Sequence, residues 1–138
     1  MEDNTCFFLC ADFDDKNCQH GYKDDVLSYV GVCNDWNIPV YIERSRSGNG
    51  AHLWIFFSEP VSAALARKLG FAILGSAMER NVQLDMKSYD RFFPNQDFVP
   101  NGGLGNLVAL PLQGDAKHEG NSLFTDENFE VCKSQWAF

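Results

Sequence analysis

Residues Glu43–Phe57 read ERSRSGNGAHLWIFF, and this stretch predicts how the middle of the chain folds. A polar turn that contains glycine separates two apolar runs rich in β-branched and aromatic residues, Pro39–Glu43 and Leu53–Phe57. Two such runs joined by a short turn are typical of a β-hairpin. We therefore expect two antiparallel strands with the polar turn at their tip.

The turn carries groups that favour an anion. Glycine permits φ > 0 and lets a ligand approach the backbone closely, and successive N–H groups in such a turn form a concavity for anions. Arginine offers a fork suited to phosphate, and serine adds a hydroxyl donor. The candidate phosphate contacts are Arg44, Arg46, Ser47, Gly48, Asn49, Gly50 and His52. The alternative is a polar hairpin tip with solvated arginines.

Hydrophobic periodicity predicts further elements on both sides of the hairpin. Cys6–Phe13 is a short apolar run typical of a buried strand, and Val82–Tyr89 alternates apolar and polar residues like a half-buried strand. Tyr22–Asn37 and Ser58–Asn81 carry apolar residues at helical spacing, and Pro60 suits the first turn of the second helix. The order is βαββαβ, which is that of an RNA-recognition-motif-like α+β fold.

The last third of the chain is expected to add a strand and loops to this fold. Asn106–Leu112 is typical of a strand that ends before Gln113, and Asn95–Gly105 is typical of a glycine-rich loop. At 138 residues, one domain over residues 1–138 is expected. Because both ends of the chain are abrupt, we expect it to be a fragment of a larger protein.

Carboxylates follow two of the predicted strands. Asp12 and Asp14 are separated by one residue, so on a strand they share a face about 6–7 Å apart. Like charges at that distance raise the pKa of one carboxyl unless a cation intervenes, and Mg2+ prefers oxygen ligands. If the first and third strands are antiparallel neighbours, His52 lies beside this pair. Asp90 ends the fourth strand, so the loop after it would have to fold back. The alternative is an ordinary acidic turn.

Composition sets limits on the function. The net charge of −8 counts against a nucleic-acid partner, because phosphate contacts dominate the affinity of such complexes. Bound metal would neutralise several carboxylates, however, and the basic residues gather in the middle of the chain. The five cysteines form no Cys-x2-Cys pair, so the zinc signature is absent and reduced thiols in the cytoplasm are expected. No apolar run approaches the roughly 20 residues that span a bilayer, so no membrane partner is expected.

Three blocks together resemble the archaeo-eukaryotic primase superfamily. They are ADFDD at Ala11–Asp15, SGNGAHLW at Ser47–Trp54 and SYDRFFPNQD at Ser88–Asp97. The chain is most similar to the primase-polymerase of TOTE conflict systems, in which GGLGNLVALPLQ, GNSLF and the terminal QWAF also recur. The resemblance extends from about Phe7 to Phe138.

This resemblance implies an RNA-recognition-motif-like palm that transfers nucleotides with Mg2+ or Mn2+. Asp12, Asp14 and Asp90 correspond to its metal-binding triad. His52, with Ser47, Gly48 and Gly50, corresponds to its triphosphate site. Many members have a serine where this chain has Gly50, and Gln113 lies near where some relatives have a basic triphosphate contact. The implied partners are nucleoside triphosphates, a DNA template and primer, and the helicase or nuclease domains to which relatives are often fused.

The function expected from these observations is that of a DNA primase or polymerase. Two metals would activate a primer 3′-hydroxyl for attack on the α-phosphorus of a nucleoside triphosphate. One alternative is a non-catalytic module that binds single-stranded nucleic acid, with Trp54 and Phe56 stacking on bases. A second is a metal-dependent nuclease. The related nicking enzymes use two histidines on one strand, and this chain has only His52 there.

Overall fold

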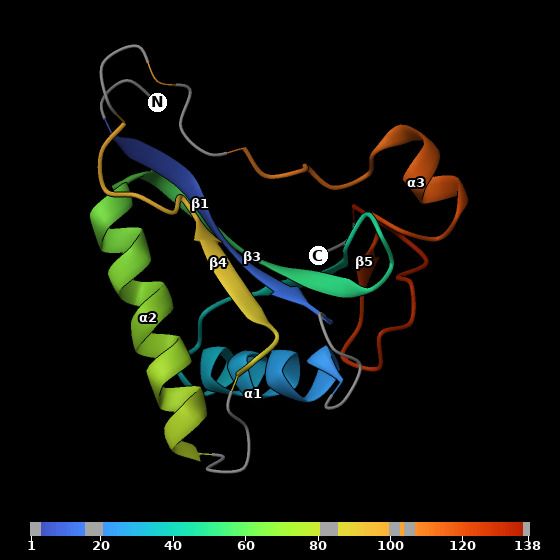
Figure 1. The fold of residues 1–138 in the computed structure, drawn as a ribbon, viewed down its shortest axis with the longest axis horizontal. Coiled ribbons are helices and arrows are strands. Elements are labelled where there is room, and N and C mark those ends of the chain that lie inside the picture. Colours follow the sequence, from blue (N-terminus) through green and yellow to red (C-terminus); the bar gives the residue numbers. More distant parts are fainter. Residues whose placement is uncertain (1–3, 16–20, 81–85, 100–102, 104–106, 137–138) are drawn as a thin grey trace.

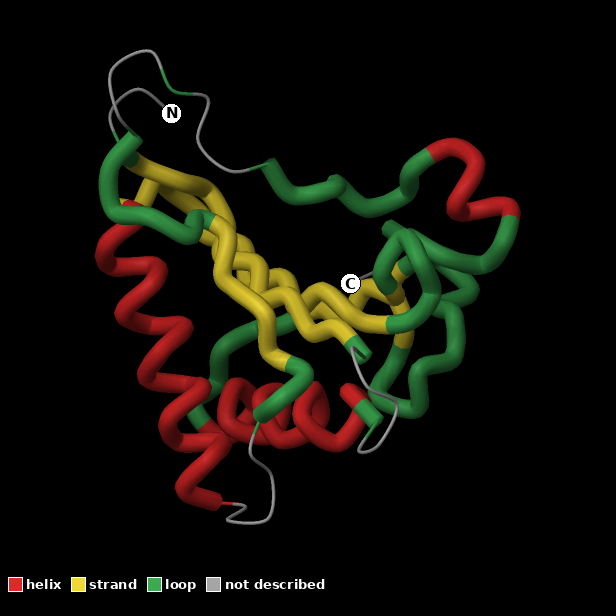
Figure 2. Tube along the Cα trace, viewed as in Figure 1, coloured by secondary structure: helices red, strands yellow, loops and turns green. Residues whose placement is uncertain are grey.

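The computed structural model describes residues 4–15, 21–80, 86–99, 103 and 107–136. In this part of the chain five strands form one antiparallel sheet of order β4-β1-β3-β2-β5 (Figures 1 and 2). The elements are β1 (Thr5–Asp14), α1 (Tyr22–Asp35), β2 (Tyr41–Arg44), β3 (Gly50–Ser62), α2 (Ala63–Arg80), β4 (Tyr89–Phe93), α3 (Gly114–His118) and β5 (Phe124–Thr125). The expected α+β class is confirmed. No helix among the described residues is long and apolar enough to cross a bilayer.

The two faces of the sheet differ in what covers them. Helices α1 and α2 pack against each other and against β1 and β3, and they lie together on one face (Figure 1). Alternate residues of β1, such as Leu9 and Phe13, point into the core beneath these helices. On the other face Cys10 and Trp54 form a smaller cluster, against which Val108 of the C-terminal segment packs. Asp12 and Asp14 share this second face.

The predicted hairpin is confirmed, and its second strand is longer than expected. β2 and β3 pair antiparallel, with Tyr41 opposite Trp54 and Arg44 opposite Ala51. β3 continues beyond the predicted Leu53–Phe57 because β1 reaches back to Thr5, which pairs with Ser62. The first and third strands are therefore long central neighbours.

The second helix begins later than predicted. Helix α2 starts at Ala63 rather than Ser58, and Pro60 lies in β3 instead of the first helical turn. Pairing with β1 keeps this segment extended up to Ser62. The Ser62 hydroxyl then accepts a hydrogen bond from the Leu65 amide at 3.3 Å, which is the bond that an N-cap serine makes.

The fourth strand also lies later in the chain than the predicted Val82–Tyr89. Residues 82–85 of that prediction are outside the described part, and Lys87 and Ser88 form a turn. β4 is Tyr89–Phe93, because Phe92 and Phe93 pair with β1 and bury their rings on opposite faces. Asp90 is therefore inside the strand rather than at its end, and the loop after it does not have to fold back.

The edge strand beyond β2 comes from the tail and not from the predicted Asn106–Leu112. Within the described residues 107–112 of that range there is neither helix nor strand. β5 pairs instead with Ile42 and Glu43. Arg44 extends this contact, because its amide donates to Leu123 O at 2.9 Å and its carbonyl accepts from the Ser122 amide at 2.9 Å. These bonds pair the outer edge of β2 with the tail.

Candidate active site

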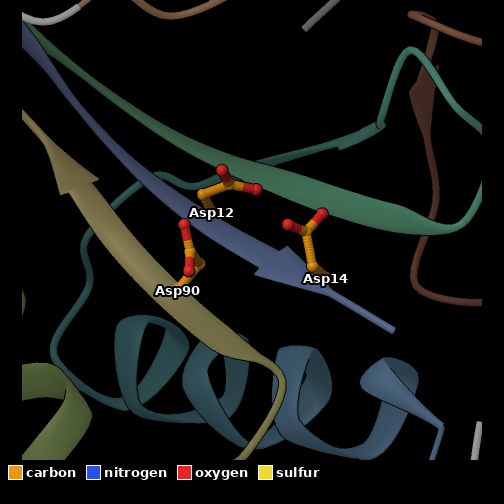
Figure 3. Close-up of side chains that lie close together, drawn as sticks. All are labelled: Asp12, Asp14 and Asp90. Atoms are coloured by element: carbon orange, nitrogen blue, oxygen red, sulfur yellow. The ribbon is translucent and has the colours of Figure 1, made fainter. Parts of the chain in front are cut away.

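Three aspartates that are distant in sequence meet on the face of the sheet opposite α1 and α2. Asp12 and Asp14 are alternate residues of β1, and Asp90 lies on the neighbouring strand β4. One oxygen of each carboxylate lies within 4.8 Å of the other two (Figure 3). The predicted triad is thus brought together.

A β-bulge turns Asp90 toward the other two aspartates. Asp12 pairs with Arg91 but Phe13 pairs with Tyr89, so Asp90 is an extra residue in the register of β4. In regular pairing Asp90 would face Phe13, whose side chain points into the core under the helices. The bulge re-aims the Asp90 side chain, which is a common use of bulges next to functional sites.

Protein cations neutralise part of the acidic cluster, since Arg91 Nε donates to Asp90 Oδ2 at 2.6 Å. Burial raises the pKa of Asp12, and the charges of Asp14 and Asp90 raise it further, while His52 acts against them. Among the described residues the buried Oδ1 atom of Asp12 accepts no hydrogen bond, and the charged group recorded beside it is His52 Nε2 at 3.5 Å. Three carboxylates close together offer the oxygen ligands that Mg2+ and Mn2+ prefer. The residues present therefore fit a divalent cation.

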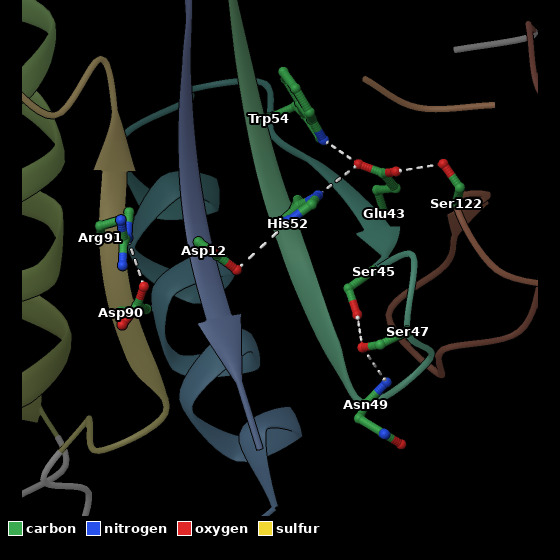
Figure 4. A network of polar contacts seen from close by, with 10 residues as sticks. All are labelled: Asp12, Glu43, Ser45, Ser47, Asn49, His52, Trp54, Asp90, Arg91 and Ser122. Carbon is green, nitrogen blue, oxygen red and sulfur yellow. Dashed lines mark hydrogen bonds and ion pairs between the residues drawn. The ribbon is translucent and has the colours of Figure 1, made fainter. Parts of the chain in front are cut away.

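His52 lies between this cluster and a buried glutamate. It is directly opposite Asp12 across the β1–β3 ladder, and its Nε2 is 3.5 Å from Asp12 Oδ1. Its Nδ1 is 3.0 Å from Glu43 Oε2 (Figure 4). Burial lowers the pKa of His52, but Glu43, Asp12 and Asp14 together raise it above its ordinary value. The surrounding carboxylates thus stabilise the charged imidazole more than burial destabilises it.

An open cleft of about 430 Å³ joins these groups to the hairpin turn. Asp12 and Asp14 line one part of it, and cationic or hydroxyl groups line another. The lining residues are Asp12, Asp14, Ser45, Arg46, Ser47, His52 and Ala109. A cleft with acidic groups for cations and with hydroxyl, guanidinium and imidazole donors can hold a metal-bound polyphosphate.

Five predicted nucleotide contacts are not among the residues that line the cleft: Arg44, Gly48, Asn49, Gly50 and Gln113. The side chains of Arg44 and Gln113 lie elsewhere in the structure. The Arg44 guanidinium donates to the carbonyl oxygens of Gly120 at 2.8 Å and Phe129 at 2.9 Å. Gln113 precedes α3, and its backbone amide donates to the Ser122 hydroxyl at 3.3 Å. The structure thus brings Arg46 to the cleft and uses Arg44 to hold the C-terminal segment.

The backbone of the turn is bonded largely to itself. The Gly48 amide donates to Ser45 O at 3.0 Å, and the Asn49 amide donates to the Ser47 hydroxyl at 3.3 Å. Gly48 has φ +78°, a conformation that favours glycine. The hydroxyls of Ser45 and Ser47 lie 3.2 Å apart (Figure 4). Side chains, rather than these two amides, are therefore the donors that the turn offers to the cleft.

Gly50 occupies the position where many primases have serine, and the packing explains the difference. A Cβ atom at Gly50 would lie 2.3 Å from the Phe13 carbonyl oxygen. No side chain fits this close approach of β3 to β1. The serines that line the cleft come instead from the turn before Gly50.

Glu43 is a site residue that the sequence pattern did not reveal. It ends an apolar run, where a charged residue is normally taken as exposed, yet it is only 1% exposed. Its carboxylate accepts bonds from His52, Trp54 and Ser122. The one available signal was the hairpin register, which places Glu43 directly opposite His52.

Comparison with known proteins agrees with this geometry. The family model of the archaeo-eukaryotic primase domain of TOTE conflict systems matches residues 1–138. No curated protein matches the chain. The match covers every residue that contributes to the acidic cluster and the cleft. The chain therefore belongs to the archaeo-eukaryotic primase domain family of TOTE conflict systems.

Proposed function

We propose that this domain is a metal-dependent nucleotidyltransferase that adds nucleotides to a primer 3′-hydroxyl on a DNA template. The observation that carries the proposal is the meeting of Asp12, Asp14 and Asp90 within 4.8 Å beside a histidine-lined cleft. Membership of the primase family supports it. The order β4-β1-β3-β2 with two helices on one face supports an RNA-recognition-motif-like palm, to which we assign residues 1–138 as one domain.

Each group in the cleft has a proposed role. Asp12, Asp14 and Asp90 hold Mg2+ or Mn2+ through carboxylate oxygens. Two such ions, when bound, lower the pKa of the attacking hydroxyl and stabilise the leaving pyrophosphate. His52 and Arg46 donate hydrogen bonds to the triphosphate and balance its charge. His52 is a donor rather than a base, because both of its ring nitrogens face carboxylates.

The turn completes the nucleotide site. The hydroxyls of Ser45 and Ser47 supply further donors to the triphosphate, and the conformation of Gly48 sets the path of the turn. Asn49 lies at the tip, and Gly50 lets β3 approach β1 closely enough to place His52 beside Asp12. We leave Arg44 and Gln113 out of the proposed phosphate contacts.

The acidic composition bears on the proposed partners. With a net charge of −8, the domain needs bound cations, and positive surface from other segments, to hold a DNA template and primer. We propose that helicase or nuclease domains of the same polypeptide or operon supply that surface. The four described cysteines are free thiols, which suits a reducing cytoplasm.

Primer extension tests the proposal directly. The purified domain is incubated with a labelled primer–template, nucleoside triphosphates and Mg2+ or Mn2+. We expect extension by the wild type and none by the Asp12→Ala/Asp14→Ala double variant. Glu59→Ala, which removes an exposed carboxylate of β3, is the matched control and should extend normally. Full activity in the double variant would refute the proposal.

Two alternatives are separated by related assays. A binding module would need exposed aromatic rings, but of the two rings expected to stack on bases, Trp54 is 1% exposed and Phe56 is 53% exposed. Such a module would bind single-stranded oligonucleotides equally with and without EDTA in matched salt, and it would not extend primers. A nuclease would cleave labelled single-stranded DNA with metal in the absence of nucleotides.

A further inference from the structure

The most buried charged group of the cleft region is Glu43, whose carboxylate receives three hydrogen bonds (Figure 4). Oε2 lies 3.0 Å from His52 Nδ1 and 2.7 Å from Trp54 Nε1. Oε1 accepts from the Ser122 hydroxyl at 3.0 Å. Burying a carboxylate is costly unless its oxygens are hydrogen-bonded, and here both are. The network is therefore a built feature of the fold rather than a chance contact.

The chemistry of the partners settles the direction of the bond to His52. An ionised carboxylate only accepts, and the indole Nε1 only donates. The imidazole nitrogen that faces Glu43 must therefore carry a hydrogen. His52 Nδ1 is that nitrogen whether the ring is neutral or charged, so Nε2 is the nitrogen left to face Asp12 and the cleft. Nε2 donates a hydrogen bond there when it carries the second ring hydrogen.

We propose that Glu43 is the positioning residue for His52. The Glu43 carboxylate accepts the hydrogen bond from His52 Nδ1–H and thereby orients Nε2 toward the triphosphate. This inference rests on the proposed function of the cleft. The direct pairing of Glu43 and His52 across β2 and β3 makes the arrangement rigid. Ser122 supports Glu43 from the C-terminal segment, and its own amide is bonded to Arg44 O at 2.9 Å.

Three variants separate positioning from plain structural support. Glu43→Ala removes the acceptor, and we expect the KM for the nucleotide to rise roughly 10–100-fold, by analogy with the loss of partners that orient metal-ligating histidines. Glu43→Gln keeps one carbonyl oxygen for His52 and Trp54, so the KM should stay within a few-fold of wild type. Ser122→Ala is the matched control: it removes a buried bond to Oε1 but leaves the bond to His52 intact.

Nitrogen-15 NMR of the histidine rings reports the proposed bond without requiring activity. The His52 signals are assigned by their loss in His52→Gln, which separates them from those of His20 and His118. We expect a hydrogen-bonded Nδ1–H in the wild type and in Ser122→Ala, and loss of that signal in Glu43→Ala. In Glu43→Gln the Nδ1–H proton should move upfield, because a neutral amide accepts less strongly than a carboxylate.

The outcomes distinguish this inference from the proposed function. The probe is dGTP with Mn2+, and its binding and use are measured by titration and by primer extension. An unchanged ring signal and an unchanged KM in folded Glu43→Ala, with an active wild type, would overturn the positioning role alone. If Glu43→Ala does not fold, an unmoved Nδ1–H resonance in Glu43→Gln overturns it instead. A wild type that neither binds dGTP nor extends primers would overturn the proposed function and the inference together.

Discussion

Asp12 lies partly buried between two carboxylates and an imidazole, where its negative charge opposes folding when no cation is bound. Burial is the largest cause of its raised pKa, and Asp14 and Asp90 add to it. A carboxyl whose pKa is higher in the folded than in the unfolded state makes the protein less stable as pH rises. The free energy of unfolding therefore falls as the pH rises from the ordinary pKa of 3.8 through the raised pKa of Asp12 in the folded protein.

We expect Asp12→Asn to stabilise the protein in EDTA while abolishing primer extension. Removing about 1 kcal/mol of such a penalty raises the Tm of a domain of this size by roughly 4 °C. Because the penalty is absent at low pH, the difference in Tm between variant and wild type should grow between pH 4 and pH 7. Thermal unfolding followed by circular dichroism measures it.

Glu59→Gln is the control for the change in net charge, because Glu59 is an exposed carboxylate away from the cluster. Its Tm should stay close to that of the wild type at every pH. A Tm for Asp12→Asn below that of the wild type at pH 7 in EDTA would contradict the charge argument.

Gly50 makes a second prediction at the scale of one residue. Gly50→Ser would restore the serine of many primases, but its Cβ would meet the Phe13 carbonyl oxygen at 2.3 Å. Overpacking of this kind typically costs 1–3 kcal/mol, so we expect a lower urea midpoint and weaker extension. Gly75→Ser is the matched control, since a Cβ at Gly75 of α2 meets nothing within 4 Å. Equal stability of the two variants would show that the strands separate easily at Gly50.

At the scale of elements, neighbouring arginines at the end of β2 serve different purposes. The Arg44 guanidinium ties β2 to the C-terminal segment through two main-chain carbonyls, whereas the exposed Arg46 lines the cleft. Arg44 and Arg46 are separated by one residue, so alternation along an extended chain would place both side chains on the same face. Alternation therefore does not explain this difference. It arises from where the C-terminal segment packs.

We expect Arg44→Ala and Arg46→Ala to fail in different assays. Arg44→Ala should lower the free energy of unfolding by about 2–3 kcal/mol, because it leaves two carbonyls without their charged donor. Arg46→Ala should change stability by less than about 0.5 kcal/mol, as exposed substitutions usually do. Its KM for the nucleotide should rise roughly tenfold, which corresponds to one lost charged contact.

Urea unfolding and primer extension on the two arginine variants provide the comparison. Arg44→Lys is a useful third variant, because a lysine retains the charge but cannot fork between two carbonyls. The opposite pattern, with a stable Arg44→Ala that has lost nucleotide affinity, would return Arg44 to the phosphate site.

On the scale of the whole molecule, the two faces of the sheet differ in role: one carries the larger hydrophobic core, and the other carries the acidic cluster. The helices bury the larger core on one face, and the C-terminal segment covers part of the other face while Ala109 reaches the cleft. The acidic cluster lies on the second face, so the charges there do not disturb the core. Cation binding at the cluster should therefore stabilise the entire fold by mass action.

We expect Mn2+ to raise the Tm of the wild type, with a gain that grows with the logarithm of the Mn2+ concentration above the Kd. At 100 times the Kd the gain is about 2.7 kcal/mol, and it should vanish on addition of EDTA. Asp90→Asn should lose most of the gain, because it replaces one of the three charged carboxylates with a neutral amide. Glu59→Gln should respond like the wild type. An equal rise in Asp90→Asn would place the bound ion elsewhere on the protein.

Local sequence patterns determined much of the fold. The hairpin around residues 45–49, helix α1 and the β1 strand follow from hydrophobic periodicity, which acts between residues close in the chain. The same period of two places Asp12 and Asp14 on one face. The neighbourhood of Asp12 and His52 followed once the first and third strands were taken as antiparallel partners.

Tertiary structure decided the features that depend on register and on distant segments. The bulge that turns Asp90 toward Asp12 exists only in the pairing of β4 with β1. The burial of Glu43 and the carbonyl contacts of Arg44 require the C-terminal segment, which packs there from far along the chain. Such contacts have no periodicity of their own, because their energy comes from meeting a partner that the local sequence does not contain.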